Sequence, residues 1–453
     1  MTDRIAVVIL AAGKGKRMHS SLPKALHPLA GKPMIDYLLK AAAALSPEPP
    51  VVVVGSGADA VRKSVGDGPR LVQQEEQLGT AHALQMAAPL LAGKVDLVLV
   101  LYSDTPLLQI ETLQRLVEVQ QHNSGPLSLL TVMGDARSDL GRITRRADGR
   151  ASAVVEKDLA SQKVLAGGEL NADVFCISGD WLWEALKCLP VSPAGEYYLS
   201  GLVELAASGG LAVQTLCVED AEEALGVNDR VCLAEAEAIM RRRINRAYML
   251  AGVTIINPEN TYIESDVKIG ADTTVWPNTY LRGKTVIGSG CSIGPNTIMD
   301  DSRIGNGCTI LNAVLECAIV EDDVDMGPFA HLRKNAHLAK GVHMGNFGEV
   351  KNSYLGPGTK MGHFSYLGDA TIGVDVNIGA GTITCNFDGV HKNPTEIGDN
   401  AFIGSDTMLV APVKIGEGAR TGAGAVVTHD VPPGEIVIGV PAHPLRKQDK
   451  GDH

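Results

Sequence analysis

Aromatic residues are scarce in this chain of 453 residues, since Phe, Trp and Tyr together make up only 4% of it. Positive charge is also in deficit, because 52 acidic residues outnumber 40 basic ones and give a formal net charge of −12. Nucleic acids and anionic membranes are held by broad basic surfaces, so the charge balance argues against both as partners. Small anions can still bind where basic residues gather.

Two further absences narrow the class of protein. No apolar run approaches the roughly 20 residues that a helix needs to span a bilayer, and the start MTDRIAVVILAAG lacks the pattern of a cleavable signal. The eight cysteines include no C-x-x-C pair, which argues against a zinc site and a redox couple, so we expect buried, reduced thiols. We therefore expect a cytoplasmic protein without membrane insertion.

The first half of the chain alternates short apolar runs with helical stretches. Runs such as IAVVIL, VVVV and LVLVLY read as buried strands, and the segments between them read as amphipathic helices. This alternation predicts a mostly parallel α/β sheet covered on both faces, with ligands at the carboxyl ends of its strands. Residues 229–251 carry acids early and bases late before Gly252, which predicts one long linker helix after a domain of residues 1–228.

The second half, residues 252–453, has a period of six. Aliphatic residues return at this spacing, often followed by glycine, which is typical of a parallel β-helix with three short strands in each coil. The spacing fails where CNFDGVHKNPTE intervenes between Thr384 and Ile397, and we expect a loop there. The repeat positions include Ile263, Ile269, Val275, Leu281, Ile287, Ile293, Ile304, Ile310, Leu355, Met361, Leu367, Ile372, Ile378, Ile397, Ile403, Leu409 and Ile415.

A glycine-rich basic loop follows the first strand. Residues 1–32 hold six bases and one acid, and the glycines let backbone amides approach a phosphate beside Lys14, Lys16, Arg17 and Lys24. The loop fits neither the dinucleotide nor the P-loop pattern. Asp104 ends a later strand and Asn228 precedes the linker helix; alone they read as a turn former and a helix cap, but together their oxygens suit a divalent ion.

A second candidate site surrounds His363 in the stretch MGHFSYLG. A histidine in a β-helix is usually a surface or corner residue. Here the imidazole suits a base that accepts a proton from an attacking amine, and Arg333 and Lys351 suit a sugar phosphate. The basic and polar residues that are dense nearby are Arg333, Lys351, Tyr366, Asn377, Asn386 and Lys392.

The motifs LAAGKGKRM, LPKALHPLAGKPM, QLGTAHA, YSDTPLL, VVEK, LNAD and GVNDR, followed by the hexapeptide half, resemble the bacterial bifunctional N-acetylglucosamine-1-phosphate uridylyltransferase/glucosamine-1-phosphate acetyltransferases. The resemblance covers nearly the whole chain in order. It implies a Rossmann-like nucleotidyltransferase domain, the linker helix, and a left-handed β-helix acetyltransferase domain. It also implies a homotrimer with sites between subunits and a product for cell-wall, peptidoglycan and lipopolysaccharide synthesis.

The resemblance also implies roles for residues of the first site. Arg17 and Lys24 act on the phosphates as catalytic residues, Asp104 and Asn228 hold Mg²⁺, and the uridine and sugar of the UTP-derived nucleotide contact a longer set. That set comprises Leu10, Ala11, Ala12, Gly13, Lys24, Gln74, Gly79, Thr80, Tyr102, Ser103, Asp104, Gly141, Glu156, Asn171 and Asn228. Ser103 departs from the family, in which many members have glycine.

For the second site the resemblance implies His363 as the general base, amino-sugar phosphate contacts, and an acetyl-CoA groove. The contacts are Arg333, Lys351, Tyr366 and Asn377, and the groove is Ala380, Asn386, Phe387, Ser405 and Ala423. Two departures concern coenzyme A. Phe387 stands where relatives have tyrosine, and Val440 and Pro441 stand near a family arginine, with Arg446 and Lys447 following.

Two other functions compete with a bifunctional enzyme. The chain could be a sugar nucleotidyltransferase whose β-helix is only structural or regulatory, or a non-catalytic solenoid scaffold. Neither needs His363, Arg333 and Lys351 together, and a scaffold does not need Asp104 beside a basic loop. We therefore favour two activities on small-molecule substrates.

Overall fold

The computed structural model describes residues 3–134, 140–156, 168–193 and 195–444. The chain forms two compact units, Met1–Met240 and Arg241–His453. The division falls inside the predicted linker, where helix α9 (Arg230–Leu250) runs. Asp229 caps this helix, because its Oδ1 accepts hydrogen bonds from the amides of Val231 and Cys232, both at 2.9 Å.

The first unit is built on a sheet with strand order β11-β7-β10-β6-β1-β4-β5, and β8 and β9 extend it beside β10. All strands of the main path run in one direction except β10, which is antiparallel to both β6 and β7. The strands are β1 (Ile5–Ala11), β4 (Val51–Val54), β5 (Arg70–Gln73), β6 (Leu97–Tyr102), β7 (Leu127–Met133), β8 (Arg142–Arg145), β9 (Ala151–Val155), β10 (Glu169–Ser178) and β11 (Val213–Val218), with a separate pair β2 (Pro28–Leu29) and β3 (Lys32–Pro33).

Helices cover both faces of this sheet, as predicted. Along β1 the side chains alternate: Val8 and Leu10 join one buried cluster with α3, α7 and α8, while Val7 and Ile9 join another with α1, α2 and α5. The helices are α1 (Met34–Leu45), α2 (Ala58–Val65), α3 (Thr80–Gln85), α4 (Ala88–Leu91), α5 (Ile110–Gln121), α7 (Gly179–Lys187) and α8 (Gly201–Ser208), with short 3-10 turns η1 (Lys16–Met18), η2 (Lys24–Leu26), η4 (Ala221–Ala224) and, in the second unit, η5 (Pro258–Asn260).

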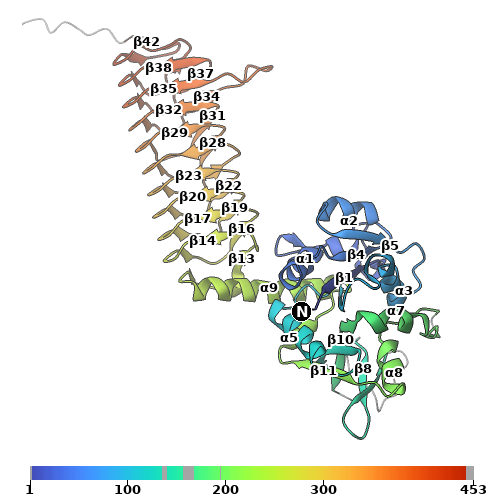
Figure 1. The fold of residues 1–453 in the computed structure, drawn as a ribbon. Helices are drawn as coiled ribbons and strands as arrows, with labels where there is room; N and C mark the ends of the chain where they lie inside the picture. The colour runs from blue at the N-terminus through green and yellow to red at the C-terminus, as the bar shows by residue number, and fades with distance from the viewer. Residues whose placement is uncertain (1–2, 135–139, 157–167, 194, 445–453) are drawn as a thin grey trace, which may run out of the picture. The chain divides into compact units, whose positions relative to one another are not determined.

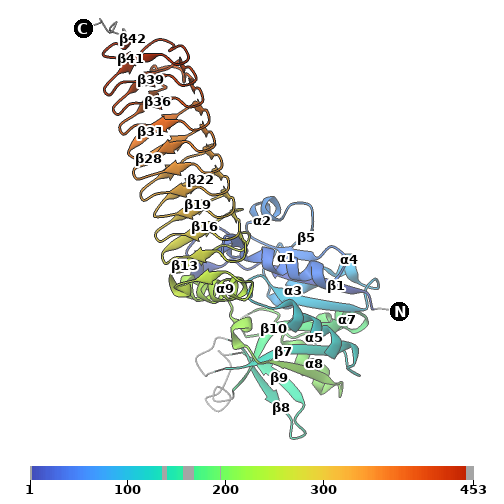
Figure 2. The ribbon, with the colours of Figure 1, turned by 90° about the vertical axis from the view of Figure 1, so that its left-hand side faces the viewer.

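The second unit is a parallel β-helix in which three sheets form the walls of a stack of coils, as Figures 1 and 2 show. One wall is β12 (Thr254–Ile255), β15 (Thr274–Val275), β18 (Ser292–Ile293), β21 (Thr309–Ile310), β24 (Asp325–Met326), β27 (His343–Met344), β30 (Lys360–Met361), β33 (Asn377–Ile378), β36 (Phe402–Ile403), β39 (Arg420–Thr421), β41 (Ile436–Ile438) and the antiparallel β42 (His443–Pro444).

The second wall is β13 (Thr261–Ile263), β16 (Thr279–Arg282), β19 (Ile298–Asp300), β22 (Val314–Glu316), β25 (His331–Leu332), β28 (Gly348–Lys351), β31 (Ser365–Gly368), β34 (Ile383–Cys385), β37 (Met408–Val410) and β40 (Val426–Val427). The third is β14 (Lys268–Ile269), β17 (Val286–Ile287), β20 (Arg303–Ile304), β23 (Ile319–Val320), β26 (His337–Leu338), β29 (Tyr354–Leu355), β32 (Ala370–Ile372), β35 (Thr395–Ile397) and β38 (Val413–Ile415).

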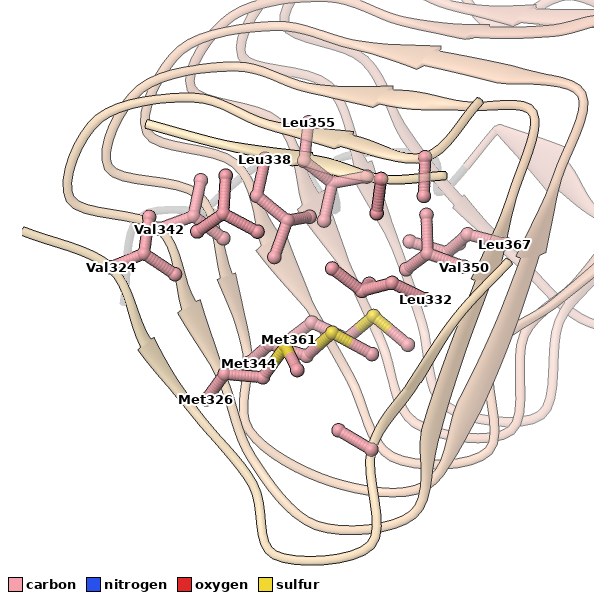
Figure 3. Packing of buried hydrophobic residues seen from close by; sticks show 14 of the residues in the cluster. Val324, Met326, Leu332, Leu338, Val342, Met344, Val350, Leu355, Met361 and Leu367 are labelled. Carbon is pink, nitrogen blue, oxygen red and sulfur yellow. The ribbon is translucent and has the colours of Figure 1, made fainter. Parts of the chain in front are cut away.

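The repeat residues form the interior of this stack. All the predicted inward positions belong to one continuous hydrophobic cluster, in which Ile269 alone is only partly buried. Figure 3 shows Met326, Met344 and Met361, which occupy partner positions in successive coils. Each coil thus buries its aliphatic residues only against the coils above and below, which is why the stack and not the single coil is the stable unit.

The predicted interruption is a loop between β34 and β35. It extends away from the stack beside β34 and β37 in Figure 1, and it is closed by an isolated antiparallel bridge between Phe387 and Lys392. Phe387 is 61% exposed at its base. The loop therefore carries polar and aromatic side chains clear of the wall.

All eight cysteines are free thiols, as predicted. The expectation that they are buried holds only in part. Cys176, Cys291 and Cys308 are buried, whereas Cys188, Cys217 and Cys317 are exposed, and Cys232 and Cys385 are intermediate. Burial raises the pKa of the Cys176 thiol to about 12, so that thiol is inert as a nucleophile.

Candidate active sites

A cavity of about 770 Å³ opens in the first unit where β1 and β6 end. Its position agrees with the rule that ligands bind at the carboxyl ends of parallel strands. Twelve of the residues predicted for the first site line it: Leu10, Ala12, Gly13, Arg17, Lys24, Gln74, Gly79, Thr80, Tyr102, Ser103, Asp104 and Asn228. The cavity is thus lined from segments that lie far apart in the sequence.

The basic loop after β1 bends tightly against its own chain. Gly15 has φ +57, and a Cβ added there would lie 2.9 Å from the Cβ of Lys24, so only glycine fits. Lys14, Lys16 and Arg17 flank this glycine at the rim, and all three are exposed and line the cavity. The folded loop therefore brings several positive charges to the mouth of one cavity, which favours an anion.

Two oxygens converge on one cation deeper in the cavity. The ammonium Nζ of Lys24 donates to Asp104 Oδ2 at 2.5 Å and to Asn228 Oδ1 at 3.0 Å. The Lys24 and Asp104 side chains are only 15% and 18% exposed. Asp104 and Asn228 thus already hold a cation between them, and hard oxygen ligands of this kind suit a divalent ion.

The fit to a divalent ion depends on ligands from the substrate. In the described part of the chain no group of three or more His, Cys, Asp or Glu side chains is arranged to hold a metal. Two protein oxygens are what Mg²⁺ often takes from a protein when phosphates and waters supply the rest. The residues present therefore fit a metal that arrives with a nucleotide.

Gln74, Gly79 and Thr80 form one wall of the cavity. The side chain of Gln74 is 4% exposed and its Nε2 donates to the carbonyl of Gly79 at 3.1 Å. Gly79 has φ +105 and a Cβ there would lie 2.5 Å from the carbonyl oxygen of Tyr197. Thr80 Oγ1 accepts from the amide of Leu199 at 2.9 Å. These contacts fix the shape of this wall.

Four of the residues predicted for the first site do not line the cavity. Ala11 packs on the opposite face of the sheet, against the cluster that includes α1 and α5. Gly141, Glu156 and Asn171 form a group of their own, in which the Asn171 amide donates to the Gly141 carbonyl at 2.8 Å. Their role in sugar binding stays a prediction.

Sequence reasoning missed several residues that line the cavity. Gln77 fixes the first loop, because its Nε2 donates to the carbonyl of Ala12 at 2.9 Å. Asp173, Ala83 and Glu196 line the cavity as well. Asp173 lies two positions after the predicted Asn171, in the quoted motif LNAD, so the motif itself contained the signal.

The second candidate site lies on the wall made by β25, β28 and β31. His331, Glu349 and Tyr366 are partners in successive strands, and Lys351 is the partner of Gly368. A Cβ on Gly368 would overlap the Tyr366 hydroxyl and lie 2.8 Å from the Asn386 amide nitrogen. Glycine at this position therefore lets Tyr366 and Asn386 approach the wall closely.

Positive charges gather on this wall. The charges of Lys392 and then of Arg333 lower the pKa of the Lys351 ammonium, which places three cations near one another. Arg333 Nη1 also donates to Glu349 Oε1 at 2.9 Å. Such a cluster favours an anion such as a phosphate. Lys392 lies on the projecting loop and is not among the amino-sugar phosphate contacts that the family resemblance implies.

His363 lies at the corner between β30 and β31 and is exposed. The pairing of Lys360 with Asn377, Asn377 with Phe402 and Phe402 with Arg420 fixes the register of the following corners. Three residues after each of those four lie His363, Ala380, Ser405 and Ala423. The predicted base and three predicted acetyl-CoA residues thus occupy one column, and Ala380, Ser405 and Ala423 form a strip of small side chains along it.

The other predicted members of this site lie around that column. Asn377 belongs to β33, the wall that meets the corner. Asn386 is 7% exposed and its Nδ2 donates to Asp369 Oδ2 at 2.6 Å, so it is fixed at the base of the loop that carries Phe387. Val440 and Pro441 are described at the last coils, whereas Arg446 and Lys447 lie outside the described residues.

Comparison with known proteins connects the two units to two families of domain. Residues 7–157 match the model of the MobA-like NTP transferase domain. Residues 266–300 and 394–429 match the bacterial transferase hexapeptide, a family of six repeats. These matches confirm the nucleotidyltransferase fold of the first unit and the left-handed β-helix of hexapeptide repeats in the second.

The chain is similar over nearly its full length to proteins named bifunctional protein GlmU. The one from a Geobacillus species is 45% identical over 439 residues, which cover 97% of this chain and 95% of the relative. The one from Pelobacter propionicus is 46% identical and covers 96% of each, and one from Streptococcus agalactiae is 43% identical and covers 95% and 94%. The chain belongs to the bifunctional GlmU family.

Membership in the GlmU family confirms the predicted enzyme. The chain is a bifunctional transferase with uridylyltransferase and acetyltransferase activities, and nothing in the matches favours a nucleotidyltransferase with a merely structural β-helix. Its substrates are small molecules and include a nucleotide. Among the described helices none is both long and apolar enough to cross a membrane.

Proposed function

We propose that the second unit acetylates glucosamine 1-phosphate with acetyl-CoA, and that the first unit then transfers UMP from UTP to the N-acetylglucosamine 1-phosphate formed. The products are UDP-N-acetylglucosamine and pyrophosphate. The convergence of Lys24, Asp104 and Asn228 inside a basic cavity carries the first assignment. The column that begins at His363 and the cluster of three cations on the neighbouring wall support the second.

The uridylyl transfer needs no protein nucleophile. A phosphate oxygen of the sugar 1-phosphate attacks the α-phosphorus of UTP in line, and pyrophosphate leaves from the opposite side. Arg17 and Lys24 neutralise the charge that builds up on the phosphates, and the rigid wall of Gln74, Gly79 and Thr80 holds the uracil base. Positioning and charge therefore account for the rate.

Mg²⁺ is the cation that we assign to Asp104 and Asn228. Held by these two residues, the ion would supply positive charge that neutralises the phosphates. Lys24 lies between the same two oxygens and, with Arg17, supplies positive charge to the phosphates.

The acetyl transfer uses His363 as a general base. The amine of glucosamine 1-phosphate attacks the thioester carbonyl, its proton passes to His363, and the coenzyme A thiolate leaves with that proton. Arg333, Lys351, Tyr366 and Asn377 hold the amino-sugar phosphate. The strip of Ala380, Ser405 and Ala423, with Asn386 and Phe387, accommodates acetyl-CoA, and its backbone amides are candidates to stabilise the oxyanion.

We further propose that the chain assembles as a homotrimer in the cytoplasm, where UTP and acetyl-CoA are made. Phe329, Phe347 and Phe364 follow one edge of the β-helix and are 55%, 60% and 56% exposed, and the first two rings stack at 5.1 Å. Such an exposed apolar ridge suits contact with further copies of the chain. The product serves cell-envelope synthesis.

Crossed variants test the two assignments in the full chain. His363→Ala is expected to lose acetyl transfer by about 100-fold or more and to keep uridylyl transfer, as expected for removal of a general base. Asp104→Asn is expected to show the reverse pattern. Retained acetylation in the first variant removes the base assignment, and an unchanged magnesium requirement in the second removes the metal assignment.

A further inference from the structure

Asp173 lies two positions after the predicted sugar-site residue Asn171 in strand β10 and lines the cavity. Gly141, Glu156 and Asn171 are close to one another but do not line it, whereas Asp173 does. A ligand in the cavity can therefore contact Asp173.

The side-chain amide of Asn171 holds Asp173 in place through two hydrogen bonds. Its Nδ2 donates to Asp173 Oδ1 at 2.6 Å, and its Oδ1 accepts from the Asp173 amide at 3.1 Å. Asn171 is 0% exposed, so both ends of its side-chain amide are used and covered. The second carboxyl oxygen of Asp173, Oδ2, forms no hydrogen bond or ion pair with the described residues.

The backbone at Asp173 is bent to present this side chain. The pairing of β10 with β7 shifts register between Asn171 and Phe175, so Asp173 lies in a β-bulge. Asp173 has φ +55, a left-handed conformation that favours glycine. Bulges of this kind re-aim side chains next to active sites, and strain at such positions often serves function.

The surroundings of Asp173 are unusual for an acid. Burial, followed by the negative charges of Glu156 and Asp104, raises the pKa of the Asp173 carboxyl to about 8. Desolvation, followed by the negative charge of Asp173, raises the pKa of the nearby Tyr102 hydroxyl well above its usual value. At neutral pH this carboxyl therefore keeps its proton and offers both a donor and an acceptor without repelling a phosphate.

We propose that Asp173 contacts the sugar ring of the sugar 1-phosphate directly, through Oδ2, and that Asn171 is the positioning residue that holds it there. A pyranose ring carries hydroxyl groups and, when acetylated, an amide, and each pairs well with a neutral carboxyl group. The inference rests on the proposed uridylyl transfer and identifies the side chain that recognises its sugar substrate.

The test compares Asp173→Gly with Asp173→Asn in the full chain. Glycine removes the carboxyl and suits φ +55, so folding is not the expected point of failure. Asparagine keeps a neutral donor and acceptor of the same shape. Asp272→Gly is the matched control, because Asp272 is an exposed aspartate with φ +60 on the β-helix.

Steady-state pyrophosphate release is measured while UTP and N-acetylglucosamine 1-phosphate are varied in turn. Loss of one such hydrogen bond is expected to raise KM for the sugar phosphate by about fivefold to tenfold in Asp173→Gly, with KM for UTP changed less than about twofold. Asp173→Asn is expected to restore KM to within about threefold of wild type, and Asp272→Gly to match wild type.

Other results of the same measurements would overturn the inference. An unchanged KM for the sugar phosphate in Asp173→Gly overturns the inference, as does an equal rise in KM for both substrates, which would indicate a structural role. If KM for the sugar phosphate is as high in Asp173→Asn as in Asp173→Gly, the role of a neutral hydrogen-bonding group is overturned. A wild-type chain without uridylyl transfer overturns the proposed function and this inference with it, whereas an active wild type with an unaffected Asp173→Gly overturns the inference alone.

Discussion

Lys24 occupies the place that we assign to Mg²⁺, and this gives a prediction about metal affinity. Its ammonium donates to Asp104 and Asn228 at 2.5 and 3.0 Å. A divalent ion that binds there must displace or approach this positive charge. The variant Lys24→Met keeps the length of the side chain and removes the ammonium, so it should bind a divalent ion more tightly than wild type while turning over more slowly.

The size of the effect follows from the burial of the pair. With Lys24 and Asp104 only 15% and 18% exposed, an effective dielectric constant near 20 applies, and unit charges about 4 Å apart interact by about 4 kcal/mol. Desolvation and side-chain entropy cancel part of this, which leaves about 1–3 kcal/mol, or roughly a 5- to 150-fold gain in metal affinity.

Titration of the nucleotide-free protein with Mn²⁺, followed by electron paramagnetic resonance, measures this affinity. Lys14→Met is the matched control, because Lys14 lines the same cavity and carries the same charge but forms no hydrogen bond with Asp104 or Asn228. Its effect is expected to stay below about threefold, as for a charge screened by solvent. Equal or weaker Mn²⁺ binding in Lys24→Met would refute the reasoning that Asp104 and Asn228 form the cation site.

Three further predictions concern stability and the second site. The folded chain holds a proton on Asp173 up to about pH 8, whereas the unfolded chain releases it near pH 3.8, so stability falls as pH rises between these values. Asp173→Asn should therefore raise Tm at pH 8 but not below pH 4. Equal Tm shifts at both pH values would contradict this prediction. Met344→Ala removes a buried side chain between Met326 and Met361, and urea unfolding should show a loss of about 2–5 kcal/mol; a loss below about 1 kcal/mol would be too small for this packing. Ala380→Leu should raise KM for acetyl-CoA about tenfold, equivalent to about 1.4 kcal/mol, and leave uridylyl transfer unchanged; an unaffected KM would exclude the corner column as the acetyl-CoA strip.

The β-helix was largely predictable from the sequence because each buried position recurs at a fixed spacing. Every coil repeats the same requirement, so an inward residue such as Ile293 or Leu367 is recognised by its spacing alone. The break between Thr384 and Ile397 was predictable for the same reason and is the loop that carries Phe387. The strand register that aligns His363 with Ser405 was not predictable from the repeat, because it depends on the lengths of the loops between them.

The first pocket was predictable where a residue follows a strand and much less so elsewhere. Asp104 ends a strand of continuous apolar residues, and Lys24 belongs to a glycine-rich loop, so both were assigned to one edge of the sheet. Asp173 was missed because its exposure to the cavity comes from a bulge inside β10, and a bulge leaves no periodic trace in the sequence. The antiparallel direction of β10 was likewise hidden, because a buried strand reads alike in either direction.

The most direct test of two independent active sites on one chain is a complementation assay. Purified His363→Ala and Asp104→Asn proteins are supplied, singly and mixed, with glucosamine 1-phosphate, acetyl-CoA and UTP, and UDP-N-acetylglucosamine is quantified by chromatography. The account predicts little product from either variant alone and restored product from the mixture, because the acetylated sugar phosphate diffuses from one intact site to the other. Product from His363→Ala alone, or none from the mixture, would contradict it.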